Sequence, residues 1–133
     1  EAWRQRRDFK QKSIMAENKS WEKTPMKLKY YLKKAEQEGW AVGQFNFSDS
    51  KTLKAIVQAA QATKAPVIIG TSEGESKSVG LAQAKALVKA YQQETGLPIF
   101  LNLDHGKSFG YIKRVIDSGY DSVHFDGSSL PLA

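Results

Sequence analysis

From Met26 onward, apolar segments of two different periods follow one another, and this alternation constrains the fold more than any other feature. Short runs rich in Val, Ile and Phe are typical of strands, and longer segments with apolar residues every three or four positions are typical of helices. The predicted helices are 27–38, 49–63, 80–94 and 108–118, and the predicted strands are 41–47, 66–71, 98–103 and 122–125. Strands that alternate with helices of 10–15 residues favour right-handed crossovers and a parallel α/β sheet.

Two architectures fit this order of elements. One is an open, doubly wound sheet, and the other is part of an eight-stranded β/α barrel. No G-x-G-x-x-G motif follows any predicted strand, so the sequence gives no support to a dinucleotide-binding site. The periodicity by itself does not choose between the two.

The composition argues against several other classes of protein. With 41% hydrophobic residues the chain has enough apolar surface to bury a core, which argues against wholesale disorder. No run approaches the ~18 apolar residues of a membrane span, so we expect no membrane partner. The chain has no cysteine, which excludes disulfides and Cys-ligated zinc and favours a cytoplasmic location.

Basic residues are concentrated near the N-terminus. Residues 1–25 hold seven Lys and Arg against four Asp and Glu, whereas charges in 26–133 are nearly balanced. We expect 1–25 to be a flexible basic extension, or a segment foreign to the native protein, and 26–133 to form the domain. A basic arm can bind nucleic acid by neutralising phosphates. This one has no Gly-Arg repeats and no regular aromatic spacing, so nucleic-acid binding is the weaker hypothesis.

Polar side chains stand at the carboxyl end of every predicted strand, where the sequences read QFNFSDS, IIGTSEGE, LNLDHGKS and HFDGSS. Each end carries a candidate ligand-binding residue or pair: Asn46, Ser72, Asp104 with His105, and Asp126. In parallel α/β folds ligands bind at the carboxyl ends of the strands, so we expect these residues to share one site. Because side chains alternate along a strand, Asn102 shares a face with Asp104, and Gln44 shares one with Asn46.

Each candidate also has a purely structural interpretation. An Asp-His pair that ends a strand is, without context, more often a cap or a hydrogen-bonding group than a catalytic site. Ser72 could begin a simple turn, and Asp126 could cap the turn at Gly127. His124 lies two residues before Asp126, and we interpret it as an interior histidine that is hydrogen-bonded to Asn102.

The segments LDHGKSF at 103–109 and SVHFDGS at 122–128 resemble the signature of the class II, zinc-dependent fructose-bisphosphate aldolase family, which includes the tagatose-bisphosphate aldolases. The segments AVGQFNFSD and APVIIGTSEGE, with the spacing of all four strands, are similar to the beginning of the same proteins. The resemblance extends from about Met26 to Leu132. It implies a TIM (β/α)8 barrel, of which this chain supplies about the first four β/α units, a half barrel.

This resemblance implies reversible, metal-dependent cleavage of fructose 1,6-bisphosphate, a sugar phosphate, to dihydroxyacetone phosphate and glyceraldehyde 3-phosphate. Asp104 matches the catalytic aspartate, which exchanges the proton of the C4 hydroxyl. His105 matches the first of three Zn²⁺-binding histidines, and Asp126 matches a carboxylate at a second site for a divalent or monovalent cation. Asn46 and Ser72 match residues near the substrate, and the resemblance implies that Ser72 contacts a phosphate group.

These residue types suit that chemistry. Breaking the C3–C4 bond leaves a carbanion, which zinc stabilises as an enediolate by acting as a Lewis acid at the C2 carbonyl. A carboxylate such as Asp104 supplies the acid/base group, and a neutral imidazole such as His105 is a suitable nitrogen ligand for zinc.

Length limits this interpretation, because a complete β/α barrel takes ~250 residues. The family's other zinc histidines, a glutamate for the second metal and the glycine-rich phosphate loops would lie outside this sequence. We therefore expect the chain alone to be inactive and the full-length parent to be a homo-oligomeric lyase. The alternative is a noncatalytic phosphosugar-binding or scaffold half barrel that needs a partner chain. The sequence leaves the preference for fructose or tagatose bisphosphate open.

Overall fold

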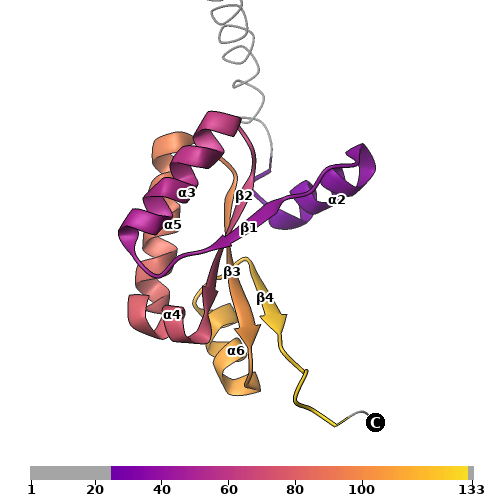
Figure 1. The fold of residues 1–133 in the computed structure, drawn as a ribbon, viewed down its shortest axis with the longest axis vertical. Helices are drawn as coiled ribbons and strands as arrows, with labels where there is room; N and C mark the ends of the chain where they lie inside the picture. The colour runs from indigo at the N-terminus through magenta and orange to yellow at the C-terminus, as the bar shows by residue number, and fades with distance from the viewer. Residues whose placement is uncertain (1–24, 132–133) are drawn as a thin grey trace, which may run out of the picture.

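A computed structural model describes residues 25–131 of the chain (Figure 1). The elements, in order, are α2 (Leu28–Glu38), β1 (Gly43–Asn46), α3 (Ser50–Thr63), β2 (Val67–Ser72), α4 (Glu73–Val79), α5 (Leu81–Thr95), β3 (Ile99–Gly106), α6 (Phe109–Asp117) and β4 (Ser122–Phe125). The expectation for residues 1–25 concerns positions that, apart from Pro25, lie outside the described residues. No helix of the described part is long and apolar enough to cross a membrane.

The four strands form one parallel sheet in the order β1-β2-β3-β4. Strands that follow one another in the sequence are neighbours in the sheet, so the order does not reverse within 25–131 as it does in a doubly wound sheet. Figure 1 shows α3, α4 and α5 on one side of the sheet and α2 on the other. The predicted α/β fold with a parallel sheet is confirmed, and the arrangement is consistent with part of a β/α barrel.

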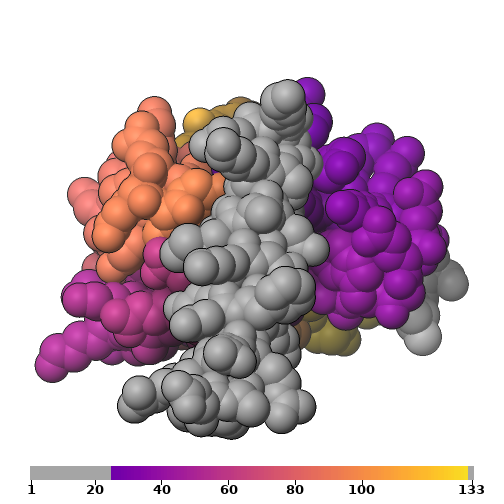
Figure 2. Space-filling model, turned by 90° about the horizontal axis from the view of Figure 1, so that it is seen from above, coloured from indigo at the N-terminus to yellow at the C-terminus, as the bar shows by residue number. Residues whose placement is uncertain are grey.

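Two hydrophobic clusters join the layers. The larger one contains buried residues of β2 and β3, such as Ile69 and Leu101, together with apolar side chains of α3, α5 and α6. The smaller one, on the opposite face of the sheet, consists of Leu28, Tyr31, Ile68 and Phe100. Seen from above, the indigo segment that contains α2 and the magenta-to-orange helices lie on opposite sides of the molecule (Figure 2). A strand that is covered on both faces has no side toward solvent, so its residues need not alternate between apolar and polar. This explains the continuous apolar run of β2.

Two elements differ from the sequence prediction. No helix was expected between the second strand and residue 80, but α4 occupies 73–79. The third strand, expected to end at Leu103, continues to Gly106 and therefore includes the Asp104–His105 pair.

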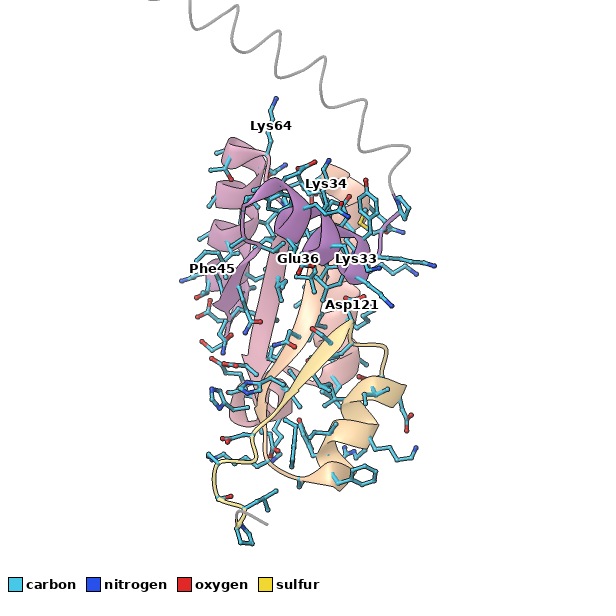
Figure 3. The ribbon with its side chains drawn as sticks, turned by 90° about the vertical axis from the view of Figure 1, so that its right-hand side faces the viewer. Lys33, Lys34, Glu36, Phe45, Lys64 and Asp121 are labelled. Atoms are coloured by element: carbon cyan, nitrogen blue, oxygen red, sulfur yellow. The ribbon has the colours of Figure 1, made fainter. Side chains whose placement is uncertain are left out.

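The edge strand β1 leaves apolar surface uncovered. Phe45, labelled in Figure 3, is 56% exposed. Beside it lies a groove with a volume of about 580 Å³, which is lined mainly by small apolar residues of β1 and α3, such as Ala55 and Ala59. On the other edge strand, β4, Phe125 is 52% exposed. Both outer strands of the described sheet thus present apolar surface that further chain could cover.

Burial of Tyr31 predicts a loss of stability at high pH. The Tyr31 side chain is 1% exposed, and burial, followed by the neighbouring Tyr30, raises its pKa from 10.0 to about 12. The folded state therefore holds the phenol proton more tightly than the unfolded state does, so its stabilising effect is complete below pH 10. We expect the free energy of unfolding to fall as the pH rises from 10 to 12.

Urea unfolding measured across this pH range checks the prediction. Tyr31→Phe removes the titrating group, and part of the decline should disappear with it. Tyr30→Phe is the matched control: Tyr30 is 39% exposed and is the smaller cause of the raised pKa, so most of the decline should stay in place. If Tyr31→Phe and the unmodified chain showed the same pH dependence, titration of Tyr31 would not be the cause of the decline.

Candidate functional site

Four of the five predicted site residues are linked by contacts at the carboxyl edge of the sheet. The Asn46 side-chain amide on β1 donates to Asp104 Oδ2 on β3, at 2.9 Å. His105 Nε2 lies 3.8 Å from Asp104 Oδ1, and His105 Nδ1 lies 3.2 Å from Asp126 Oδ2, just after β4. The expected convergence of strand ends therefore brings together residues that are up to 80 positions apart in the sequence.

A β-bulge brings Asp104 and His105 to the same side of β3. Leu103 pairs with Val123 and Gly106 with Phe125, so β3 has one more residue than β4 between these two pairs. His105 has a φ of 54°, in the left-handed region that side chains other than glycine rarely adopt. Neighbouring residues of a regular strand point to opposite faces. The bulge is therefore what lets both side chains reach one site, and local strain of this kind is typical of functional positions.

Gly70 on β2 has no side chain, and the space above it lets side chains of β1 and β3 meet. A Cβ atom on Gly70 would lie 1.9 Å from Asn46 Oδ1 and 3.3 Å from Gln44 Nε2. Through this gap Asn46 reaches Asp104, and Gln44 Oε1 accepts a hydrogen bond from the Asn102 amide at 3.0 Å. The polar faces expected from strand alternation are thus joined across a strand that has no side chain in the way.

Gly70→Ala should break this connection. The new methyl group would push the Asn46 amide away from Asp104, and we expect a cost of about 1–3 kcal/mol in the free energy of unfolding. Chemical denaturation of Gly70→Ala, Asn46→Ala and the double variant tests the cause. In the Asn46→Ala background the clash is relieved, so Gly70→Ala should cost much less. An equal cost in both backgrounds would contradict the explanation.

Ser72 begins helix α4 and connects it to the site. Its hydroxyl accepts from the Glu75 backbone N–H at 3.2 Å, and the Glu75 carboxylate accepts from the Ser72 N–H at 2.7 Å, which forms a capping box. The same Glu75 oxygen lies 3.4 Å from the Asn46 amide nitrogen. The substrate role expected of Ser72 stays a prediction. Sequence reasoning missed Glu75, although the S-x-x-E spacing at 72–75 is the signature of such a helix start.

Glu73 of α4 holds the loop that follows the Asp104–His105 pair. Its carboxylate accepts a hydrogen bond from the Lys107 backbone N–H at 2.8 Å. That bond, with a smaller contribution from the Lys77 ammonium group, lowers the pKa of Glu73. Helix α4, which was not predicted, thus supports both β1 and the end of β3 beside the site.

Asp126 orients His105. Its carboxylate accepts from the Ser128 hydroxyl at 2.6 Å and from the Ser128 N–H at 3.1 Å, and these bonds, with the His105 contact, lower its pKa to about 2. A carboxylate on Nδ1 favours the imidazole tautomer that keeps Nε2 unprotonated, as in many metal-binding histidines. The role of Asp126 as ligand to a second cation stays a prediction.

His124 is not the interior histidine that we expected. Its side chain is 52% exposed, and its Nδ1 lies 3.6 Å from Asp104 Oδ1. The His124 and His105 rings are 4.6 Å apart. Asn102, the expected partner, is bonded instead to Gln44 and to the Ser122 hydroxyl. The interpretation was wrong because strand alternation predicts only which face of the sheet a side chain is on. It does not predict how far that side chain lies from the exposed carboxyl end of the strand.

Three of these side chains fit a metal ion. One ligand atom each from Asp104, His105 and His124 lies within 4.8 Å of the others. Two imidazole nitrogens and one carboxylate oxygen are ligands that zinc accepts. The donor set of this site therefore suits a divalent transition metal.

A parallel sheet that gathers carboxylates and imidazoles at its carboxyl edge is typical of α/β proteins that bind ligands in this position. The model of one such family, fructose-bisphosphate aldolase class-II, matches residues 26–133. The chain belongs to this family, whose members are lyases that generally depend on a metal.

Individual relatives agree with this assignment. The chain is 40% identical over 105 residues to the probable fructose-bisphosphate aldolase of Bacillus subtilis (strain 168), a match that covers 75% of this chain and 36% of that protein. It is 35% identical over 102 residues to the sulfofructosephosphate aldolase of Alkalicoccus urumqiensis, a match that covers 77% of this chain and 36% of that protein. The chain thus spans little more than a third of the length of these relatives.

Solved structures show the same fold. The YdjI aldolase from Escherichia coli K12 has a TM-score of 0.67 and 25% sequence identity, with 76% of this chain and 39% of that chain covered. The fructose-bisphosphate aldolase from Campylobacter jejuni has a TM-score of 0.60 and 24% identity, with 68% of this chain and 29% of that chain covered. The four-stranded sheet therefore matches part of a larger α/β domain in each case.

Proposed function

We propose that this chain carries the metal-binding and proton-transfer part of a class II aldolase site. The protein to which it belongs would cleave fructose 1,6-bisphosphate reversibly to dihydroxyacetone phosphate and glyceraldehyde 3-phosphate. The observation that carries this proposal is the position of Asp104, which contacts Asn46 on one side and lies 3.8 Å from His105 on the other.

His105 is the proposed zinc ligand, because its Nδ1 is held by Asp126 and its Nε2 faces Asp104. When bound, zinc supplies a Lewis acid that polarises the ketose carbonyl and stabilises the negative charge that develops there. Asp126 orients the imidazole and, in this proposal, is also available to a second cation. Asn46 and Ser72 are the proposed contacts to the sugar phosphate.

Asp104 is the proposed acid/base group. In the cleavage direction its carboxylate takes the proton of the C4 hydroxyl, the C4 oxygen becomes the aldehyde carbonyl, and the electron pair of the C3–C4 bond passes to the ketose fragment. Carbon C3 of that fragment then takes up a proton from water, which completes dihydroxyacetone phosphate. In the condensation direction the same carboxyl returns the proton. The hydrogen bond from Asn46 to Oδ2 holds the carboxylate in one orientation and leaves Oδ1 toward the imidazoles.

The complete domain is proposed to be a TIM barrel, which a single sheet of four strands does not close. The exposed edge strands β1 and β4, and the apolar groove between β1 and α3, support this proposal, because further strands and helices could cover them. For the same reason we expect residues 1–133 alone to give no turnover.

The test is an assay of the protein expressed from its complete reading frame, with fructose 1,6-bisphosphate as substrate. We expect release of dihydroxyacetone phosphate that stops with a chelator and returns when Zn²⁺ is added. Cleavage that is insensitive to the chelator would contradict the proposal. Binding of the substrate without cleavage would favour a noncatalytic phosphosugar-binding protein instead.

A further inference from the structure

We propose that Glu75 determines how well the site accepts a phosphate group at C6 of its substrate, because the Glu75 carboxylate weakens the binding of a dianion there. The inference rests on the proposed function, in which His105 binds the metal and Asp104 takes the C4 proton. It goes beyond that function, since the family resemblance gave Glu75 no role.

The contacts of Asp104 indicate which end of the substrate lies near Glu75. The proposed metal ligand His105 lies 3.8 Å from Asp104 Oδ1 and contacts Asp126 after β4. Asn46 on β1 donates to the other oxygen, Asp104 Oδ2. With the C2 carbonyl at the metal and the C4 hydroxyl at Asp104, the carbon chain continues away from the metal. Carbons C5 and C6 therefore extend toward β1 and β2.

Glu75 lies between the two residues that are the proposed contacts to the sugar phosphate. Its Oε2 accepts from the Ser72 N–H at 2.7 Å and lies 3.4 Å from the Asn46 amide nitrogen. Ser72 pairs with Asp104 in the register of β2 and β3, and α4 follows β2 directly at the carboxyl edge of the sheet (Figure 1). A phosphate group held by Ser72 and Asn46 would therefore lie directly beside the Glu75 carboxylate.

No basic side chain balances the charge of Glu75. Within residues 25–131 its carboxylate forms no ion pair, whereas the neighbouring Glu73 is paired with Lys77 at 3.2 Å. The Ser72 N–H, which could otherwise bind a phosphate oxygen, is already bonded to Glu75. A phosphate dianion at this position finds one donor occupied and is repelled by an unbalanced negative charge. A C6 hydroxyl group is uncharged and is not repelled.

Steady-state kinetics of the complete protein with two substrates test the inference. Fructose 1,6-bisphosphate has a phosphate at C6, and fructose 1-phosphate has a hydroxyl there. Glu75→Gln removes the charge but keeps a side-chain oxygen that can accept from the Ser72 N–H, as glutamine does in capping boxes. We expect the ratio of kcat/KM for the bisphosphate to kcat/KM for the monophosphate to rise about three- to tenfold at low ionic strength. Added salt should reduce this gain, because it screens the charge.

Glu94→Gln is the matched control. It removes the same charge from an exposed residue near the end of α5, which precedes β3 and so lies at the opposite edge of the sheet. Its ratio should equal that of the unmodified enzyme. Glu75→Ala removes the charge and the capping box together, and we expect it to show the same gain as Glu75→Gln. Circular dichroism establishes that each variant keeps its fold.

An unchanged ratio in Glu75→Gln, in an enzyme that cleaves fructose 1,6-bisphosphate, would overturn the inference and leave the proposed function in place. A gain that appears only in Glu75→Ala would also overturn it, because the cause would be the helix start and not the charge. If the complete protein cleaves neither ketose phosphate, the proposed function fails and the inference fails with it. A gain in both Glu75 variants and none in Glu94→Gln establishes Glu75 as a specificity-determining residue.

Discussion

Replacing Asp104 by Asn is expected to lower kcat for fructose 1,6-bisphosphate cleavage by about 10²–10⁴-fold in the complete protein. The amide has nearly the same shape as the carboxylate, but it cannot take a proton from the C4 hydroxyl or return it. Steady-state kinetics with saturating Zn²⁺ measure the effect. The excess metal is needed because Asp104 Oδ1 also faces His105 and His124, and weaker metal binding must not be mistaken for lost proton transfer.

Asp117→Asn makes the same chemical change at an exposed residue of α6 that is paired only with Lys113 in the described contacts. We expect its kcat to equal that of the unmodified enzyme. Full activity in Asp104→Asn, or an equal loss in both variants, would show that Asp104 is not the acid/base group.

Replacing Phe100 by Ala is expected to lower the free energy of unfolding by about 3–5 kcal/mol. The Phe100 side chain is fully buried, and its ring lies 5.4 Å from that of Tyr31. The smaller cluster, which joins α2 to the sheet, contains only four buried residues, so the cavity would remove a large part of its contacts. Against a total stability of about 5–15 kcal/mol, such a loss should be evident in urea unfolding followed by circular dichroism.

Phe109→Ala removes the same ring from a side chain that is 82% exposed, at the start of α6. Its expected cost is about 0.5 kcal/mol or less. Equal effects of the two substitutions would mean that α2 is not held to the sheet by the contacts of Phe100.

The alternation of strands and helices could be predicted because each element follows from nearby residues. Asp49, for example, accepts hydrogen bonds from the N–H groups of Lys51 and Thr52 at 2.8 Å and so begins α3 where the sequence suggested. Gly39 and Gly96 end α2 and α5 in the left-handed conformation that glycine adopts at little cost. The capping box of α4 is equally local, and its helix was missed only because the S-x-x-E spacing was not recognised.

The sequence by itself determined the parallel α/β fold, the family and the gathering of polar residues at the strand ends, because period, caps and motifs are all short-range features. Only the tertiary structure decided how those residues meet. The bulge after Leu103 turns His105 toward Asp104, and the gap at Gly70 lets Asn46 cross a whole strand. The exposed position of His124 beside them depends on the pairing of β3 with β4. These arrangements arise from register and packing between segments distant in the chain, which no local pattern encodes.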